Sequence, residues 1–320
     1  METLQSVLAI DIGGSKIAAG LVTADGALHR QKTIQARASQ GGEAIMKRVI
    51  ELALEFIRST PPESGLAPQA IGLGTGGQVI LGEGAIAFAT SVIPGWSGMP
   101  VRRRLEEATG LPVQVENDAN AMVIGEALFG AGRGHSLVVG ITVGTSIGGG
   151  VALDQHIFHG AHGFSNNIGH MVINYRGKCC PCGQRGCLEA YASAPAMVSD
   201  FKQRVGRARL LNEFGLNPSK FGVKEIEQLA RSGVAEAVAA ITQGAEYLGI
   251  GLASILNLFD PEIVVVGGGA AQIGELYLSQ VRSTAHQLAL PTAASIPIVP
   301  AGLKTWANLV GAACIVWGKA

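Results

Sequence analysis

Three cysteines and one histidine form the strongest local chemical signal in this sequence. Cys180, Cys182 and Cys187 lie in one short stretch, and His170 precedes them. One imidazole and three thiolates are the ligand set of a closed, tetrahedral Zn²⁺ site. Because four protein ligands leave no position for water, we expect a structural zinc, with a set of free thiols as the alternative. Cys179 is an extra neighbour to which we assign no role.

A second candidate group lies in the segment ENDAN, residues 116–120. An apolar stretch that predicts a strand precedes this segment, and a predicted helix begins within it, so its side chains should emerge at a strand end. Asp118 is the candidate general base, since a carboxylate that accepts a hydroxyl proton contributes roughly 10²- to 10⁴-fold to phosphoryl transfer. The structural alternative is a helix N-cap, a position where Asn and Asp are common.

The segment DIGGSK, residues 11–16, combines a carboxylate with two glycines. Glycines let backbone N–H groups approach phosphate oxygens, and an aspartate just before them can hold a hydrated Mg²⁺ ion. The segment is neither a Walker loop nor a Rossmann fingerprint. It predicts a phosphate-binding turn or a plain tight hairpin. The candidate nucleotide-binding residues here are Asp11, Gly13, Gly14, Ser15 and Lys16.

The same design recurs near the middle of the chain. VLAIDIGGSKIAAGLV (residues 7–22) aligns with VVGITVGTSIGGGVAL (residues 138–153). Asp11 then falls on Thr142, Gly13 on Gly144, and Ser15 on Ser146, so the second turn comprises Gly144, Thr145 and Ser146. A repeat at about half the chain length favours two similar lobes about a pseudo-twofold axis, with the hairpins facing across a cleft. Chance similarity of two Gly-rich hairpins is the alternative.

Apolar periodicity predicts the elements that must position these residues. We expect three strands within residues 6–33, further strands at 70–74, 113–115 and 263–266, and helices at 43–58, 101–109, 234–259, 271–285 and 307–318. The last helix should fold back onto the first lobe. We therefore predict one lobe of residues 1–117 plus 301–320, and a second of residues 118–300 that carries the zinc site.

Composition limits the class of partner. The chain has 320 residues, 48% of them hydrophobic, enough for two compact lobes. Lys plus Arg and Asp plus Glu number 24 each with no long block of either sign, which argues against nucleic acid as a partner. Apolar stretches are shorter than the roughly 20 residues of a membrane helix, and no signal-peptide pattern opens the chain. We expect a soluble, cytoplasmic protein that acts on a small molecule.

Five motifs in this order resemble the ROK family of sugar kinases and repressors: DIGGSK, ENDANA, GTSIGGG, IGH followed by CPCGQRGCLEAYAS, and DPEIVVVGGG. The similarity spans nearly the whole chain. It implies a two-lobed α/β fold of the actin/hexokinase-like (ribonuclease H-like) class, in agreement with the hairpin repeat. It also implies transfer of the ATP γ-phosphoryl group to a sugar 6-hydroxyl, with Asp118 as base and Asp11 orienting Mg²⁺.

The resemblance implies further binding residues. Sugar contacts would come from Asn117, Asp118, Asn167, His170 and Glu189, with Gly76, Gly77, Thr90 and Ser91 closing the pocket from the first lobe. Gly267, Gly268 and Gly269 match the family's adenosine-side turn, although a helix-start turn is the alternative. Relatives usually carry Glu where this chain has Asn167, so an acceptor-only carboxylate is replaced by an amide that also donates. Ser146 stands where relatives often have Gly.

The stretch GTGGQVILGEGAIAFATSVIPGW resembles N-acetylmannosamine kinases. Small residues at this turn would leave room for a 2-acetamido group, and a generic turn is the alternative. We expect N-acetylmannosamine or a related hexose as substrate, with a glucokinase or N-acetylglucosamine kinase as the alternative. A repressor of this family needs a DNA-binding module, and only ten residues precede Asp11. A non-catalytic sugar-sensing regulator is the alternative of another class, for which Asn167 is the hint. Since dimers are frequent in the family, we expect a homodimer.

Overall fold

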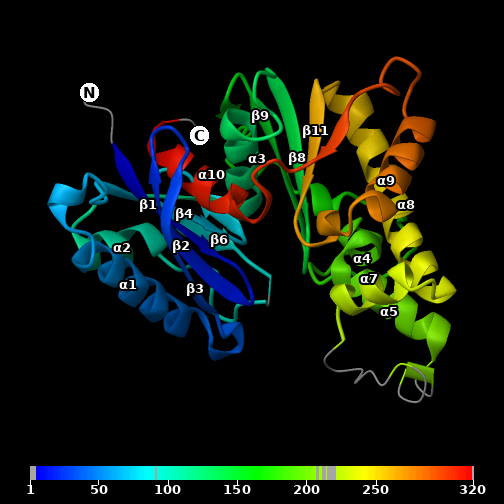
Figure 1. Ribbon diagram of the computed structural model, residues 1–320, viewed down its shortest axis with the longest axis horizontal. Coiled ribbons are helices and arrows are strands. Elements are labelled where there is room, and N and C mark those ends of the chain that lie inside the picture. The colour runs from blue at the N-terminus through cyan, green and yellow to red at the C-terminus, as the bar shows by residue number, and fades with distance from the viewer. Residues whose placement is uncertain (1–4, 91, 207–208, 211–213, 215–220, 319–320) are drawn as a thin grey trace. The chain divides into compact units, whose positions relative to one another are not determined.

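The computed structural model describes residues 5–90, 92–206, 209–210, 214 and 221–318. Ser91, one of the predicted sugar-pocket residues, lies outside the described residues. The contacts divide the chain into two compact units. The first comprises residues 1–140, 149–166 and 301–320, and the second comprises residues 141–148 and 167–300. Figure 1 follows the chain by colour from its N-terminus to its C-terminus.

The first sheet contains the three strands predicted within residues 6–33 and the two predicted at residues 70–74 and 113–115. Its members are β1 (Ser6–Ile12), β2 (Lys16–Thr23), β3 (Leu28–Gln35), β4 (Ala70–Thr75) and β7 (Val113–Asn117), in the order β3-β2-β1-β4-β7. β1, β2 and β3 pair antiparallel, whereas β4 lies parallel to both β1 and β7. A separate small hairpin joins β5 (Gln78–Ile80) to β6 (Ala85–Phe88). The carboxyl ends of β1, β4 and β7 therefore share one edge of the sheet.

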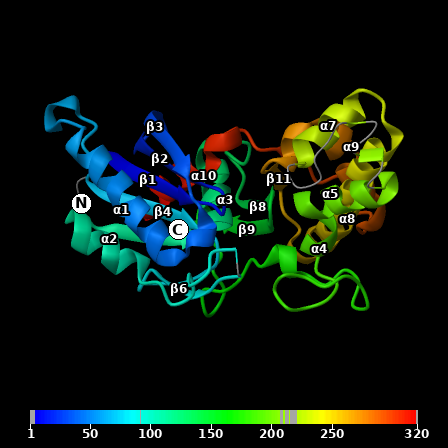
Figure 2. The same cartoon turned by 90° about the horizontal axis from the view of Figure 1, so that it is seen from below.

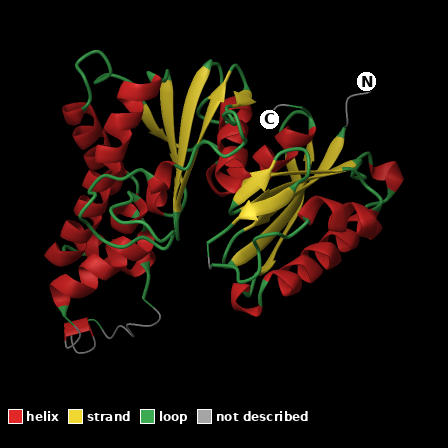
Figure 3. Ribbon diagram, turned by 180° about the vertical axis from the view of Figure 1, so that it is seen from behind, coloured by secondary structure: helices red, strands yellow, loops and turns green. Residues whose placement is uncertain are grey.

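Helices cover both faces of this sheet (Figure 3), and the residues of β1 alternate between them. Leu8 and Ile10 belong to the core that contains residues of α1 (Gly42–Arg58) and α2 (Val101–Thr109). Val7 and Ala9 pack instead with α10 (Ala307–Val316). A strand buried on both faces reads as a continuous apolar run, as β1 does. The contacts group α10 with the first unit, and it packs on this sheet (Figure 1).

Two glycines let α10 approach its neighbours at backbone distance. A Cβ added to Gly311 would lie 1.6 Å from the carbonyl oxygen of Ala121 in α3 (Asp118–Phe129). A Cβ added to Gly72 in β4 would lie 1.7 Å from the carbonyl oxygen of Ala312. Any side chain at either position would separate these backbones.

A buried carboxylate fixes the chain where it leads into α10. Glu126 of α3 is fully buried. Its side chain accepts hydrogen bonds from the backbone N–H groups of Ala131 at 2.8 Å, Gly302 at 2.9 Å and Leu303 at 2.8 Å. Three charge-assisted bonds satisfy a buried carboxylate that would otherwise be strongly destabilising.

The second sheet has the topology of the first. It contains β8 (Leu137–Val143), β9 (Ile147–Leu153), β10 (His156–Ile157), β11 (Ile263–Gly267) and β12 (Ile298–Pro300), in the order β10-β9-β8-β11-β12. When the strands of each sheet are counted along the chain, both sheets have the spatial order third, second, first, fourth, fifth. β2 begins at Lys16 and β9 at Ile147, which are aligned positions of the sequence repeat. The repeat therefore reflects a duplicated structure, not a chance likeness of two turns.

The helices of the second unit pack around α8 (Ala235–Phe259), as Figure 2 shows. Its partners are α4 (Glu189–Ala192), α5 (Ala194–Val205), α7 (Val223–Arg231) and α9 (Glu275–Leu288). The helix predicted at 271–285 begins later, at Glu275. Gly274, with φ of 77°, separates α9 from a 3₁₀ turn at Ala270–Ile273, because a left-handed residue ends one helix before the next begins.

The compact units differ from the predicted lobes in residues 118–140 and 149–166, which the contacts group with the first unit. The physical reason is the close packing of α3 against α10. The division into folding domains after residue 117 stays a prediction. In the part of the chain that the structure describes, no helix is both long and apolar enough to cross a membrane.

Candidate active site

Two aspartates meet at the carboxyl edge of the first sheet. The strand register places Asp11 of β1 beside Gly74 of β4, which in turn lies beside Glu116 of β7. A Cβ added to Gly74 would be 3.6 Å from the Cα of Asp118 and 3.7 Å from Oδ1 of Asp11. A Cβ added to Gly76 would be 4.0 Å from Oδ2 of Asp118. Glycines at the end of β4 and just after it thus leave room for both carboxylates, at the strand edge where α/β proteins commonly bind ligands.

Burial makes both carboxylates stronger bases than usual. For Asp11, burial and the charge of Asp118 raise the pKa to about 7, although the hydrogen bond that Asn308 Nδ2 donates at 3.1 Å opposes the shift. Burial also raises the pKa of Asp118, against the opposing hydrogen bond from the N–H of Ala119 at 2.9 Å. A divalent cation near Asp11 would relieve this repulsion, and carboxylate oxygens are suitable ligands for Mg²⁺ or its bound water.

Asn117 has a structural role in addition to its predicted one. It is the N-cap of α3, and its Oδ1 accepts hydrogen bonds from the N–H groups of Ala119 at 2.9 Å and Asn120 at 3.2 Å. Its Nδ2 donates to the carbonyl oxygen of Gly77 at 3.0 Å. The N-cap alternative is therefore correct for Asn117, whereas Asp118 is the first helical residue. This bond also draws the predicted pocket glycine Gly77 to the start of α3.

The first Gly-rich turn connects β1 to β2. The N–H of Gly13 donates to the carbonyl oxygen of Lys16 at 2.9 Å, and Gly14, Ser15 and Lys16 are exposed. A Cβ added to Gly14 would lie 2.7 Å from the side chain of Val92, so glycine is favoured there. The turn follows Asp11 directly, which places the predicted phosphate-binding backbone beside the paired aspartates. Thr90, also of this unit, is half-buried.

The second Gly-rich turn lies against the predicted adenosine-side turn. The N–H of Gly144 donates to the carbonyl oxygen of Ser146 at 2.9 Å, and the side chains of Thr145 and Ser146 are exposed. Gly268 has φ of 85°, and a Cβ added to it would lie 2.5 Å from the carbonyl oxygen of Val143. Gly267 is the last residue of β11, and Gly268 and Gly269 follow it. Gly268 thus lies against Val143, the last residue of β8 before the second hairpin turn.

The four predicted metal ligands converge. The ligand atoms of His170, Cys180, Cys182 and Cys187 all lie within 4.8 Å of one another. His170 Nδ1 is 3.7 Å from the sulfur of Cys180, and the sulfurs of Cys182 and Cys187 are also 3.7 Å apart. Tetrahedral Zn–S bonds of about 2.3 Å require sulfurs about 3.8 Å apart, so the spacing fits Zn²⁺. Cys179 is exposed and is not part of this cluster.

Glu189 connects the cysteine cluster to the second hairpin. Its Oε2 accepts a hydrogen bond from the N–H of Ile147 at 3.0 Å, and the thiol of Cys180 donates to its Oε1 at 3.9 Å. A Cβ added to Gly169 would lie 2.0 Å from the carbonyl oxygen of Ile147. Burial raises the pKa of the Cys180 thiol to about 12, so the thiolate that a zinc ligand must supply requires the cation itself.

The predicted site residues thus form two groups. The first unit contains Asp11, the first turn, Gly76, Gly77, Thr90, Asn117 and Asp118. The second unit contains the second turn, Asn167, His170, Glu189, Gly267–Gly269 and the cysteines. Asn167 is exposed and precedes the 3₁₀ turn Ile168–His170. Sequence reasoning missed Asn308, whose contact with Asp11 spans 297 residues and leaves no local pattern.

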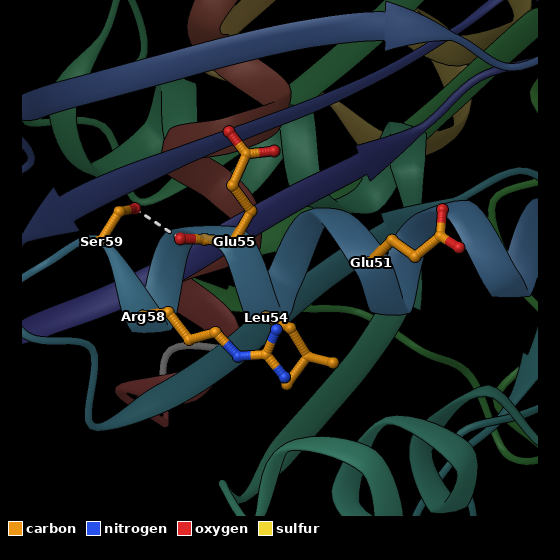
Figure 4. Close-up of a pocket in the computed structure, with 5 residues that line it drawn as sticks. All are labelled: Glu51, Leu54, Glu55, Arg58 and Ser59. Atoms are coloured by element: carbon orange, nitrogen blue, oxygen red, sulfur yellow. Dashed lines mark hydrogen bonds between the residues drawn. The ribbon is translucent and has the colours of Figure 1, made fainter.

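A hollow on the surface of the first unit holds none of these residues. It runs along α1 and is lined by Glu51, Leu54, Glu55, Arg58 and Ser59 (Figure 4). Exposed charges line it, among them Glu55, whose Oε2 lies 2.7 Å from Nζ of Lys32. We assign it no part in the chemistry, because it contains no buried polar group that could fix a ligand.

Two sheets of one topology, each with a Gly-rich hairpin turn, define an α/β protein of the actin/hexokinase-like class. The profile of the ROK family matches residues 7–319, and the chain belongs to that family. A glucokinase of Thermotoga maritima is 32% identical over 313 residues, covering 97% of this chain and 96% of that protein. A xylose repressor of Caldicellulosiruptor bescii is 30% identical over 288 residues, covering 88% of this chain and 70% of that protein.

A solved structure agrees with the fold. The ROK glucokinase of Streptomyces griseus, in complex with glucose and AMPPNP, is 33% identical with a TM-score of 0.85 and covers 97% of this chain and 98% of its own. The family and the two-sheet α/β fold that the motifs implied are therefore confirmed.

Proposed function

We propose that this protein is an ATP-dependent sugar kinase that transfers the γ-phosphoryl group to the 6-hydroxyl of a hexose. The observation that carries the proposal is the pair Asp11 and Asp118, both with a raised pKa, at the carboxyl edge of the first sheet. Family relatives named as glucokinases at 32% and 35% identity support a kinase rather than another use of the fold.

Each aspartate has a separate role in this proposal. Asp118 accepts the proton of the attacking hydroxyl as the oxygen bonds to the γ-phosphorus and the bond to the β-phosphate oxygen breaks. Its raised pKa increases its affinity for that proton. Asp11 would hold the Mg²⁺ of the nucleotide through its carboxylate or a bound water, and such a cation would offset the negative charge of the phosphates.

Backbone amides would bind the nucleotide. The two hairpin turns, Gly13–Lys16 and Gly144–Ser146, present N–H groups to phosphate oxygens, and Gly267–Gly269 accepts the adenosine against its backbone. The sugar would contact Asn117 and Asp118 together with Gly76, Gly77, Thr90, Ser91, Asn167, His170 and Glu189. These assignments are proposals that the family motifs support.

Two hexoses are the candidate acceptors. Relatives named as glucokinases, and the glucose complex of the Streptomyces griseus enzyme, favour glucose. The small turn at Gly76 and Gly77 beside Asp118 favours a 2-acetamido sugar such as N-acetylmannosamine. A coupled ADP-release assay with N-acetylmannosamine, N-acetylglucosamine, glucose, mannose and fructose compares them directly.

A sugar-binding regulator without catalysis is the second candidate, favoured by relatives that are xylose repressors and by Asn167 in place of the usual Glu. The same assay separates the two, since saturable sugar binding without ADP formation would identify the regulator. The homodimer and the cytoplasmic location stay predictions.

We also propose that His170, Cys180, Cys182 and Cys187 hold a structural Zn²⁺ ion. The converging ligand atoms support it. With four protein ligands the ion has no open position, so its contribution is to fold the loop that carries His170 and Glu189.

The decisive test of the kinase proposal is Asp118→Asn. We expect at least about a hundredfold loss of kcat, because the amide cannot accept the hydroxyl proton as a carboxylate does. Asp154→Asn is a matched control, since Asp154 is exposed in a turn with φ of 50°, a conformation that Asn tolerates. Near wild-type turnover of a folded Asp118→Asn protein would refute the assignment of the base.

A further inference from the structure

A second carboxylate beside the proposed base has no part in the chemistry described above. Glu116, the residue two before Asp118, is only 4% exposed. Its Oε1 accepts hydrogen bonds from the N–H of Asn117 at 2.8 Å and from Nδ2 of Asn120 at 3.0 Å. Glu116 therefore contacts both the residue before Asp118 and the first turn of α3 that follows it.

The other carboxylate oxygen of Glu116 bonds to a histidine distant in sequence. His159 Nε2 lies 2.6 Å from Glu116 Oε2, and the His159 side chain is 17% exposed. A carboxylate oxygen is an acceptor, so this bond forms when the hydrogen is on Nε2 of His159. One oxygen of Glu116 therefore contacts the junction of β7 and α3, and the other contacts His159.

His159 belongs to a loop, residues 158–166, whose two ends are joined. Nδ2 of Asn166 donates to the carbonyl oxygen of Phe158 at 2.8 Å, and the hydroxyl of Ser165 donates to the same oxygen at 2.6 Å. Asn166 Nδ2 also lies 3.0 Å from Oδ1 of Asn120. Asn166 adopts φ of 68°, a left-handed conformation that asparagine tolerates better than most residues. The loop is thus held to α3 through Asn120 and to β7 through Glu116.

We propose that His159, Glu116, Asn120 and Asn166 form a positioning network that sets the orientation of the base Asp118. The network fixes the backbone on both sides of Asp118, through Asn117 and Asn120. It also fixes Asn166, directly before the proposed sugar-binding residue Asn167. The inference rests on the proposed kinase function, since it assigns these residues a role in the same site. None of the four is proposed to touch the substrate.

The physical basis is the sensitivity of phosphoryl transfer to alignment. A displacement of about 1 Å at the reacting atoms lowers a rate by about a hundredfold, while the affinity for the nucleotide depends on other contacts. Loss of the His159 bond leaves one oxygen of the buried Glu116 without a hydrogen-bond donor. We expect the carboxylate to rotate toward other donors, and this rotation would displace Asn117 and Asn120, which are bonded to its other oxygen. The effect should fall on kcat more than on the KM for ATP.

The experiment compares His159→Leu, His159→Gln and the control His156→Gln. Leu removes the donor, whereas the amide nitrogen of Gln occupies a position close to Nε2 and can donate to Glu116. His156 is exposed in β10, with its Nδ1 near the carbonyl oxygen of Asp154. We expect His159→Leu to lower kcat by about tenfold or more with the KM for ATP within about twofold of wild type. His159→Gln should recover most of kcat, and His156→Gln should match wild type.

Thermal melting and amide hydrogen exchange complete the test. A kcat for His159→Leu within twofold of wild type would overturn the proposal, as would a loss explained by unfolded protein and not restored by Gln. If the wild-type protein forms no ADP with any hexose, the kinase proposal fails on its own. The network is then tested by exchange of the Ala119 and Asn120 amides, which should be faster in His159→Leu but not in His159→Gln. Unchanged exchange would refute it.

Discussion

The charge on Asp11 should destabilise the ligand-free protein, and Asp11→Asn should therefore stabilise it at alkaline pH. Burial and the neighbouring charge of Asp118 raise the pKa of Asp11 from its ordinary value of 3.8 to about 7. An asparagine has nearly the same shape, and its Oδ1 can still accept the hydrogen bond from Asn308.

The sign follows from proton binding. Between pH 3.8 and pH 7 the folded protein holds a proton on Asp11 that the unfolded chain has released, so stability falls as pH rises through this interval. The penalty is absent below pH 3.8 and complete above pH 7. At about 1.4 kcal/mol per pH unit its upper limit is about 4 kcal/mol, and because Asp11 is partly exposed, solvent screening reduces our expectation to about 2 kcal/mol.

The assay is urea unfolding in the presence of a chelator, at pH 5 and at pH 8, for the wild type and Asp11→Asn. The advantage of the variant should grow by about 1 to 2 kcal/mol between these pH values. Asp25→Asn is the control, since Asp25 is exposed and hydrogen bonds from Thr23 and the N–H of Ala27 lower its pKa. That control should show no gain at pH 8. An advantage of Asp11→Asn that is equal at both pH values, or absent at pH 8, would refute the electrostatic reasoning.

Two further predictions concern the metal site and the packing of the last helix. Cys182→Ser should lose zinc by elemental analysis and melt at a lower temperature, whereas Cys179→Ser, at an exposed cysteine outside the cluster, should do neither; full zinc content in Cys182→Ser would contradict the site. Gly311→Ala should lower the free energy of unfolding by about 3 kcal/mol or more, since the new methyl group would overlap the backbone carbonyl of Ala121. An unchanged unfolding midpoint for Gly311→Ala would show that α10 can move away from α3 without loss of stability.

Much of the fold could be predicted because its signals are local. Apolar periodicity gave α2 as Val101–Thr109 and the end of α8 at Phe259, both as the structure has them. The hairpin repeat predicted two similar lobes, because strand, turn and strand lie within sixteen consecutive residues, and the structure has two sheets with the same strand order. The predicted metal ligands converge for the same reason, since three of the four lie within one short loop.

The start of α9 shows where local reasoning is insufficient. The apolar pattern extends back through Ala271, yet the chain turns at Gly274 with a positive φ and the helix begins one residue later. Glycine tolerates both helical and left-handed conformations, so its identity does not determine which one the packing selects.

The sequence by itself determined the duplicated hairpins, the position of Asp118 at a strand-to-helix junction and the clustering of the proposed metal ligands, because each depends on residues close together in the chain. Only the tertiary structure decided which distant side chains complete the site. It brought Asn308 to Asp11, His159 to Glu116, and the carboxylate of Asp118 into a buried setting that changes its pKa. The partners and the burial of these polar groups depend on how helices and strands pack together. The residue pattern within a single helix or strand does not show that packing.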